Sequence, residues 1–135
     1  MSIFGGSKKD TRHIDEGLAQ LLGSDEPAAI EFWKKRLKLT AAVPSDVARV
    51  GALTPQIRQL VRIDNVDECT RLTRARIIAF AQLSPEDRQT LAAARRKAFE
   101  VDPAVMKADQ ALVEQLLPTL DEKVRAAYPS PGHTT

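Results

Sequence analysis

The chain has 135 residues and a mass of 14.9 kDa, which suits one domain built around one hydrophobic core. Hydrophobic residues make up 43% and charged residues 28%, values that argue against a disordered, collagen-like or purely coiled-coil chain. The formal net charge of +2 is too small to indicate a nucleic-acid or membrane partner by itself.

The single cysteine and the first residues bear on the cellular compartment. Cys69 has no second cysteine with which to form an internal disulfide, and it cannot build a cysteine-based zinc site alone. Residues 1–10 lack the apolar run of a signal peptide, and no stretch reaches the roughly eighteen apolar residues of a membrane span. These features predict a cytoplasmic protein without a membrane span.

Glycine, serine and proline concentrate at the two ends of the chain. We expect residues 1–9 and 129–135 to be flexible segments and residues 10–128 to form one all-helical domain. Apolar spacing and capping residues predict helices in its first half at 10–23, 26–42, 46–50 and 54–64.

Capping residues divide the second half of the chain in the same way. The pairs are Asn65 with Glu68, Ser84 with Pro85, Asp102 with Pro103, and Thr119 with Glu122. They predict helices at 66–83, 85–101, 103–117 and 120–127. No strand pattern competes with them. Of these eight predicted segments, six to seven are expected to form the helices of the fold, which is all-α, a single irregular or orthogonal bundle of six to seven short helices.

The helix predicted at 26–42 separates basic from apolar side chains most clearly. Its basic arc consists of Lys34, Lys35 and Lys38. The opposite arc consists of Ile30, Trp33, Leu37 and Ala41, with Phe32 and Leu39 on its flank. We expect the apolar arc to be buried on two sides. The basic arc is either an ordinary solvated face or a contact with an acidic partner.

A carboxylate is predicted on the inner face of helix 103–117. Asp109 falls between apolar positions, and a buried charge needs a partner. Arg76, Arg88 and Arg95 also lie within or beside the apolar arcs of their helices. We therefore expect Asp109 to form a buried ion pair with Arg76, Arg88 or Arg95 that fixes how the helices pack.

A stripe on helix 85–101 has a second interpretation. Arg88, Arg95 and Phe99 recur along one side of this helix, and arginine mixed with an aromatic residue is common at protein interfaces. These three residues, together with the three lysines of the basic arc, are the predicted contacts with a protein partner.

Residues 46–62 resemble a helix-turn-helix, the DNA-binding motif of two short helices joined at a glycine. Val47, Gly51, Ile57 and Leu60 carry the resemblance. It implies a recognition helix that presents residues able to contact bases or phosphates, namely Gln56, Arg58, Gln59 and Arg62. Residues 34–76 hold ten basic and four acidic residues, and this local excess of positive charge favours the same interpretation.

The residues of common catalytic sites are scarce. His13 is predicted in the first turn of a helix and His133 in the tail, so neither is expected to serve a zinc site or a catalytic triad. Cys69 falls on an inner stripe and is expected to be buried and unreactive. No glycine-rich nucleotide-binding motif is present. We predict no catalytic residues, no metal and no cofactor.

The leading prediction is a non-catalytic helical interaction protein, meaning a small adaptor, accessory subunit or assembly factor. It would bind another protein, or a second copy of itself, through its basic and Arg/Ala-rich helix faces. The alternatives are a helix-turn-helix DNA-binding protein and, third, a small enzyme or cofactor-binding helical protein.

Overall fold

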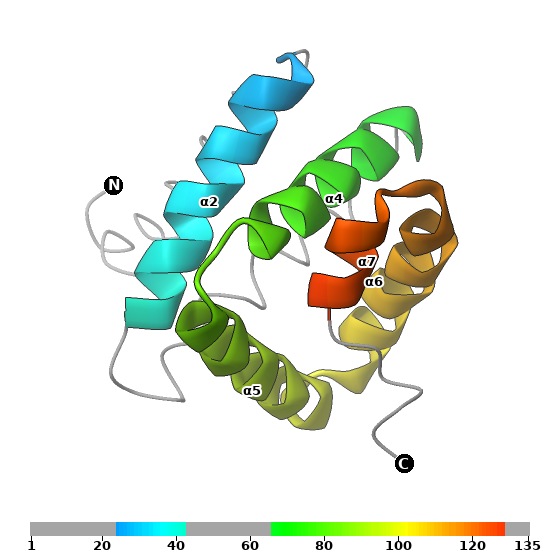
Figure 1. Cartoon of the computed structure of the whole chain (residues 1–135). Helices are drawn as coiled ribbons and strands as arrows, with labels where there is room; N and C mark the ends of the chain where they lie inside the picture. Colours follow the sequence, from blue (N-terminus) through cyan, green and yellow to red (C-terminus); the bar gives the residue numbers. More distant parts are fainter. Residues whose placement is uncertain (1–23, 43–65, 129–135) are drawn as a thin grey trace, which may run out of the picture.

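The computed structural model describes residues 24–42 and 66–128, and within these ranges the ordered elements are helices, with no strand. The elements are α2 (Glu26–Ala42), α4 (Val66–Ala81), α5 (Pro85–Val101), α6 (Pro103–Leu116), the 3₁₀ turn η2 (Leu117–Thr119) and α7 (Glu122–Ala127) (Figure 1). The all-α class is confirmed for these residues. The helices predicted at 10–23, 46–50 and 54–64 lie outside them, so the total of six to seven helices and the bundle arrangement stay predictions.

The predicted helix starts at Pro85 and Pro103 are confirmed. Ser84 has an extended backbone, and its side-chain oxygen accepts a hydrogen bond of 3.2 Å from the backbone N–H of Asp87. The proline that follows occupies the first helical position, where its missing N–H is harmless. Asp102 precedes α6, but its side chain does not make the predicted capping hydrogen bond.

Two other helix boundaries differ from the prediction. α4 ends before position 83, because Leu83 N–H bonds to the carbonyl of Phe80 in the tighter three-residue pattern. Thr119 does not cap the last helix, since it lies in η2 and its hydroxyl donates to a backbone carbonyl one turn earlier. Asp121 is the cap instead, and its carboxylate accepts from the backbone N–H of Lys123.

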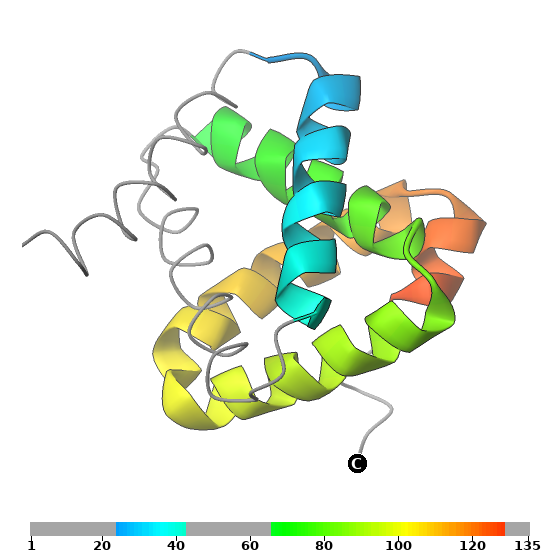
Figure 2. The same cartoon turned by 90° about the vertical axis from the view of Figure 1, so that its left-hand side faces the viewer.

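The main core lies where α2 packs against α4, with α6, η2 and α7 on the other side of α4. Figure 2 shows α2 lying across α4, and α5 meeting α6 at a sharp corner. The largest fully buried apolar side chains are Trp33, Leu72, Ile77, Met106 and Val113. Burial of such side chains is the main stabilising contribution to a fold of this size.

Arg71 of α4 forms hydrogen bonds that link the start of α2 to α4. Arg71 donates to both carboxylate oxygens of Glu68, each at 2.9 Å, and to the backbone carbonyl of Ser24 at 2.7 Å. Glu68 is therefore in an ion pair within α4. Asn65, its predicted partner in a capping box, lies outside the described residues.

The burial of two predicted core residues differs from expectation. Leu39 was expected to be buried on the flank of its helix, but 60% of its surface is exposed. Trp33 and Leu37 of the same helix are buried as expected. Cys69 is half-buried rather than fully buried.

Candidate functional site

Asp109 is buried in α6 and pairs with two of the three arginines named from the sequence. One terminal nitrogen of Arg76, on α4, donates to both carboxylate oxygens at 2.8 Å. Arg95, on α5, donates to one of the same oxygens at 2.8 Å. The side chain of Asp109 is 2% exposed and that of Arg76 is 7% exposed. The ion pairs therefore join three helices inside the fold.

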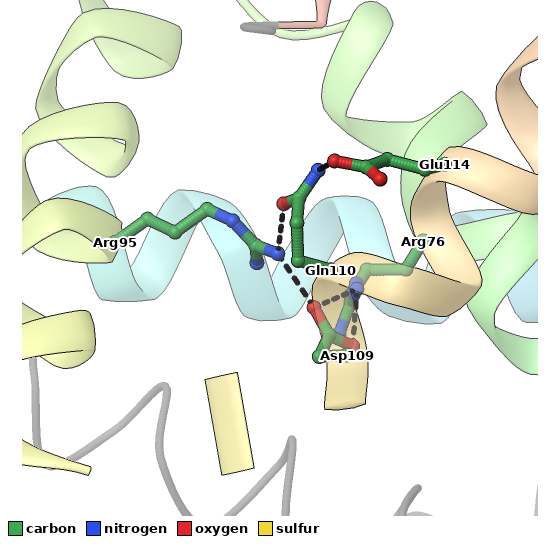
Figure 3. A network of polar contacts seen from close by, with 5 residues as sticks. All are labelled: Arg76, Arg95, Asp109, Gln110 and Glu114. Carbon is green, nitrogen blue, oxygen red and sulfur yellow. Dashed lines mark hydrogen bonds and ion pairs between the residues drawn. The ribbon is translucent and has the colours of Figure 1, made fainter. Parts of the chain in front are cut away.

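Polar contacts extend from Arg95 toward the surface. Its nitrogen that bonds to Asp109 also donates to the side-chain oxygen of Gln110 at 2.8 Å. The amide nitrogen of Gln110 in turn donates to Glu114 at 3.3 Å (Figure 3). Glu114 is exposed, so the two arginines meet one buried carboxylate and, through Gln110, one exposed carboxylate. We call these five residues the arginine network.

Charge pairing sets the protonation states in the arginine network. Burial acts to raise the pKa of Asp109, but the positive charges of Arg76 and Arg95 outweigh it, and this pKa is lowered. Burial acts to lower the pKa of Arg76, but the carboxylate of Asp109 and the phenol of Tyr128 outweigh it, and this pKa is raised. Asp109 is thus ionised at neutral pH and accepts hydrogen bonds from both arginines.

Arg88, the third arginine, does not pair with Asp109. One of its terminal nitrogens donates to the carbonyl of Leu83 at 2.8 Å and more weakly to that of Ala81 at 3.4 Å. Ala81 is the last residue of α4 and Leu83 lies in the turn that follows, a position where the helix dipole favours a cation. Arg88 therefore holds the turn between α4 and α5.

Arg88 also lines an open groove of about 220 Å³. The groove lies between the first turns of α5 and the end of α7, with Phe80 contributed by α4. The rings of Phe80 and Tyr128 meet edge to face, with centroids 5.0 Å apart. The groove is also lined by Pro85, Gln89, Ala92, Ala126 and Ala127. Its lining combines a cation and an amide with apolar surface.

The basic arc of α2 is at the surface. Lys35 and Lys38 are exposed, and Leu39 is exposed beside them. Lys34 lies at the edge of this arc, 27% exposed, with its ammonium 3.6 Å from the carboxylate of Glu31. Residues three and four apart are neighbours on a helix, so Lys35, Lys38 and Leu39 form one patch. We call this patch the outer α2 face.

Arg95 and Phe99 of the predicted stripe make contacts within the chain. The guanidinium carbon of Arg95 lies 5.7 Å from the centroid of the Phe99 ring, a cation–π arrangement. Phe99 is half-buried and packs on a small second core formed by Ala98 and Met106. The side chain of Arg95 is only 15% exposed. Of the stripe, only Arg88 reaches the groove.

Several predicted residues lie outside the described part of the chain. They are Gln56, Arg58, Gln59 and Arg62 of the helix-turn-helix resemblance, and the two histidines. Within residues 24–42 and 66–128, no three side chains among His, Cys, Asp and Glu gather closely enough to hold a metal ion. In the same ranges no helix combines the length and apolar character needed to cross a bilayer.

The thiol of Cys69 has a raised pKa in the folded chain. Its partial burial raises its pKa, and this outweighs the opposite influence of Thr73 and Arg76. A raised pKa leaves less of the reactive thiolate at neutral pH. The prediction of an unreactive cysteine is consistent with this direction, although the side chain is less buried than expected.

Two features of the candidate sites were missed from the sequence. Gln110 is not among the residues named from the sequence, but it is 7% exposed and bonds to Arg95. Tyr128 was expected at the boundary of a flexible tail, but it is 8% exposed and packs on Phe80. A tyrosine at a domain end in a chain with 4% aromatic residues was the available signal.

Comparisons of the chain with models of protein families, with curated proteins and with solved structures found no significant match. The function proposed below therefore depends on the chain's own residues.

Proposed function

We propose that this chain is a non-catalytic interaction protein, an adaptor, accessory subunit or assembly factor that binds another protein through the outer α2 face. The observation that carries the proposal is the exposure of Leu39, 60% of whose surface faces solvent beside the exposed Lys35 and Lys38. A large apolar side chain at such a place supplies contact area, and the two lysines favour a partner with acidic residues around an apolar contact.

The rest of α2 is suited to present this patch rigidly. Trp33 and Leu37 are buried against the core, and Thr40 is buried with its hydroxyl bonded to the carbonyl of Arg36 at 2.9 Å. The patch thus stands on a helix whose opposite side is fixed, and little ordering entropy remains to be lost on binding.

The proposal is tested by photo-crosslinking from defined positions. A photoreactive amino acid is placed at position 39 and, as a control, at position 107, where Lys107 is exposed on α6. The full chain is expressed in its native cells, irradiated and analysed by mass spectrometry. We expect one dominant partner crosslinked from position 39 and none shared with position 107. The same products from both positions, or none from position 39, would contradict the proposal.

Charge reversal provides the quantitative arm with the captured partner. We expect K35E/K38E to weaken binding by at least about tenfold, equivalent to about 1.4 kcal/mol, and to reduce its dependence on salt. The matched control is K97E/K107E, which makes the same charge change at exposed lysines on α5 and α6. Equal weakening by both pairs would indicate a net-charge effect rather than a docking face.

Duplex-DNA binding through residues 46–62 is retained as the alternative proposal. It is supported by the helix-turn-helix resemblance and by the excess of basic residues in 34–76. It is tested by the salt dependence of duplex-DNA binding and by R58A/R62A.

A further inference from the structure

The groove beside Arg88 combines a fixed cation with an apolar floor. One terminal nitrogen of Arg88 is held by the carbonyls of Leu83 and Ala81, which limits the motion of the guanidinium. The other donors of this guanidinium make no hydrogen bond or ion pair with the residues that the structure describes. Arg88 therefore has donor capacity left for a ligand, and its position does not have to be organised on binding.

The remaining lining residues determine what such a ligand must look like. Among the residues that the structure describes, no acidic side chain lines the groove, so none of them neutralises Arg88 there. Gln89 adds an amide, while Phe80, Tyr128 and Ala92 supply apolar surface. An arginine matches a carboxylate in charge and in geometry, and apolar surface beside it favours an adjoining apolar group.

The size of the groove indicates where the carboxylate comes from. Pockets that enclose small molecules usually measure about 300–1,000 Å³, and this groove is smaller and open to solvent. A space of about 220 Å³ suits one or two side chains anchored from a partner's surface. We infer that the groove binds an acidic side chain of a partner protein together with the apolar side chain next to it.

This inference rests on the proposed function, because it supplies a second contact for an interaction protein. The groove involves α4, α5 and α7, and the outer α2 face involves none of these helices. The two surfaces can therefore be tested independently.

The test is a titration of the ¹⁵N-labelled full chain followed by two-dimensional NMR. The probe is N-acetyl-aspartyl-phenylalanine amide, and its matched control is N-acetyl-asparaginyl-phenylalanine amide, which lacks only the charge. We expect the aspartyl peptide to shift the backbone amides of Arg88, Gln89, Ala92 and Tyr128. We expect the asparaginyl peptide to bind about tenfold more weakly, the effect of losing a hydrogen bond to a charged group.

Variants at position 88 identify the group responsible. R88Q should abolish the preference for the aspartyl peptide, and its overall NMR spectrum shows directly whether the fold persists. R88K retains the charge and should retain part of the preference, which keeps the test decisive if R88Q unfolds. R96Q removes an exposed arginine from the same helix and should change nothing.

Three outcomes overturn the inference. One is equal binding of the two peptides, which would make the groove merely apolar. Another is that the aspartyl peptide shifts only backbone amides of residues outside the groove. The third is a shift of the amides of residues 129–135 caused by R88Q without any peptide, which would make this chain's own last residues the occupant.

The outcome also separates the inference from the proposed function. If neither peptide binds but position 39 still crosslinks one partner, the inference about the groove is wrong and the proposed function stands. If the aspartyl peptide is preferred but position 39 gives no crosslink, the outer α2 face is not the docking surface and the inference about the groove stands. K35E/K38E should leave peptide binding unchanged in either case.

Discussion

Arg76 and Asp109 lie 33 residues apart in the chain, yet one guanidinium nitrogen of Arg76 bonds to both oxygens of the Asp109 carboxylate at 2.8 Å. Arg95 adds a third hydrogen bond from α5. Because α4, α5 and α6 each contribute one member, the ion pairs define how these three helices pack. A buried ion pair does not by itself imply high stability, since removing both charges from water is costly.

The first prediction concerns removal of the buried carboxylate. D109N leaves Arg76 and Arg95 close together without a buried counter-charge, so we expect the free energy of unfolding to fall by about 3–5 kcal/mol. Urea denaturation at pH 7 measures it. The control is E114Q at the exposed end of the network, for which we expect a loss below about 1 kcal/mol. A D109N variant as stable as the native chain would show that the ion pairs do not support the fold.

A second prediction concerns acid. Burial raises the pKa of Asp109 but Arg76 and Arg95 lower it further, so in the folded chain this pKa lies below its ordinary value of 3.8. A group of this kind stabilises the fold above its unfolded-state pKa, and the contribution is lost as the pH falls through the folded-state pKa. The stability difference between the native chain and D109N should stay constant from pH 7 to about pH 5 and narrow below about pH 4. A difference that grows on acidification would contradict this assignment.

The third prediction separates stability from specificity. Replacing the whole buried set in R76M/R95M/D109L removes the charges together and keeps similar side-chain volumes. Such replacements elsewhere are often neutral or stabilising by about 1–4 kcal/mol, and we expect the triple variant to be far more stable than D109N. Denaturation with urea gives the comparison. If the triple variant is as unstable as D109N, the hydrogen-bond geometry itself is needed for folding.

Local sequence signals predicted the positions of the helices better than they predicted the contacts between helices. The bounds of α5 were predicted correctly because serine and proline at its start act through neighbouring backbone atoms. The pairing of Asp109 with an inner arginine followed from the cost of burying a charge, but the choice between Arg76, Arg88 and Arg95 depends on how helices cross. No periodicity within one helix contains that information.

The groove beside Arg88 was even harder to predict from the sequence. Phe80, Arg88 and Tyr128 come from different elements, and only the packing of α7 brings Tyr128 to the other two. The exposure of Leu39 has a similar origin, because an apolar residue on the flank of an arc is buried only if a neighbouring element covers that flank.

The fourth prediction uses the buried tryptophan. Trp33 is 0% exposed, and its indole nitrogen has no hydrogen-bond partner among the described residues. W33A should cost about 3–5 kcal/mol, the usual loss for a buried aromatic side chain. W33F also loses volume, but it removes an unpaired donor whose burial costs about 1–3 kcal/mol, so its net loss should be about 1 kcal/mol or less. Denaturation followed by circular dichroism measures both, and equal losses would indicate that the indole nitrogen is in fact hydrogen-bonded, for example to water.

The fifth prediction tests the DNA-binding alternative. If residues 46–62 form a helix-turn-helix, the chain binds duplex DNA with an affinity that falls steeply with salt, because phosphate contacts release counterions. R58A/R62A should weaken binding and reduce the slope of log affinity against log salt by roughly 2, about one for each phosphate contact. The control is K97A/K107A, which removes the same charge from α5 and α6. Absent or salt-independent binding, or equal weakening by both pairs, would exclude residues 46–62 as a specific DNA contact.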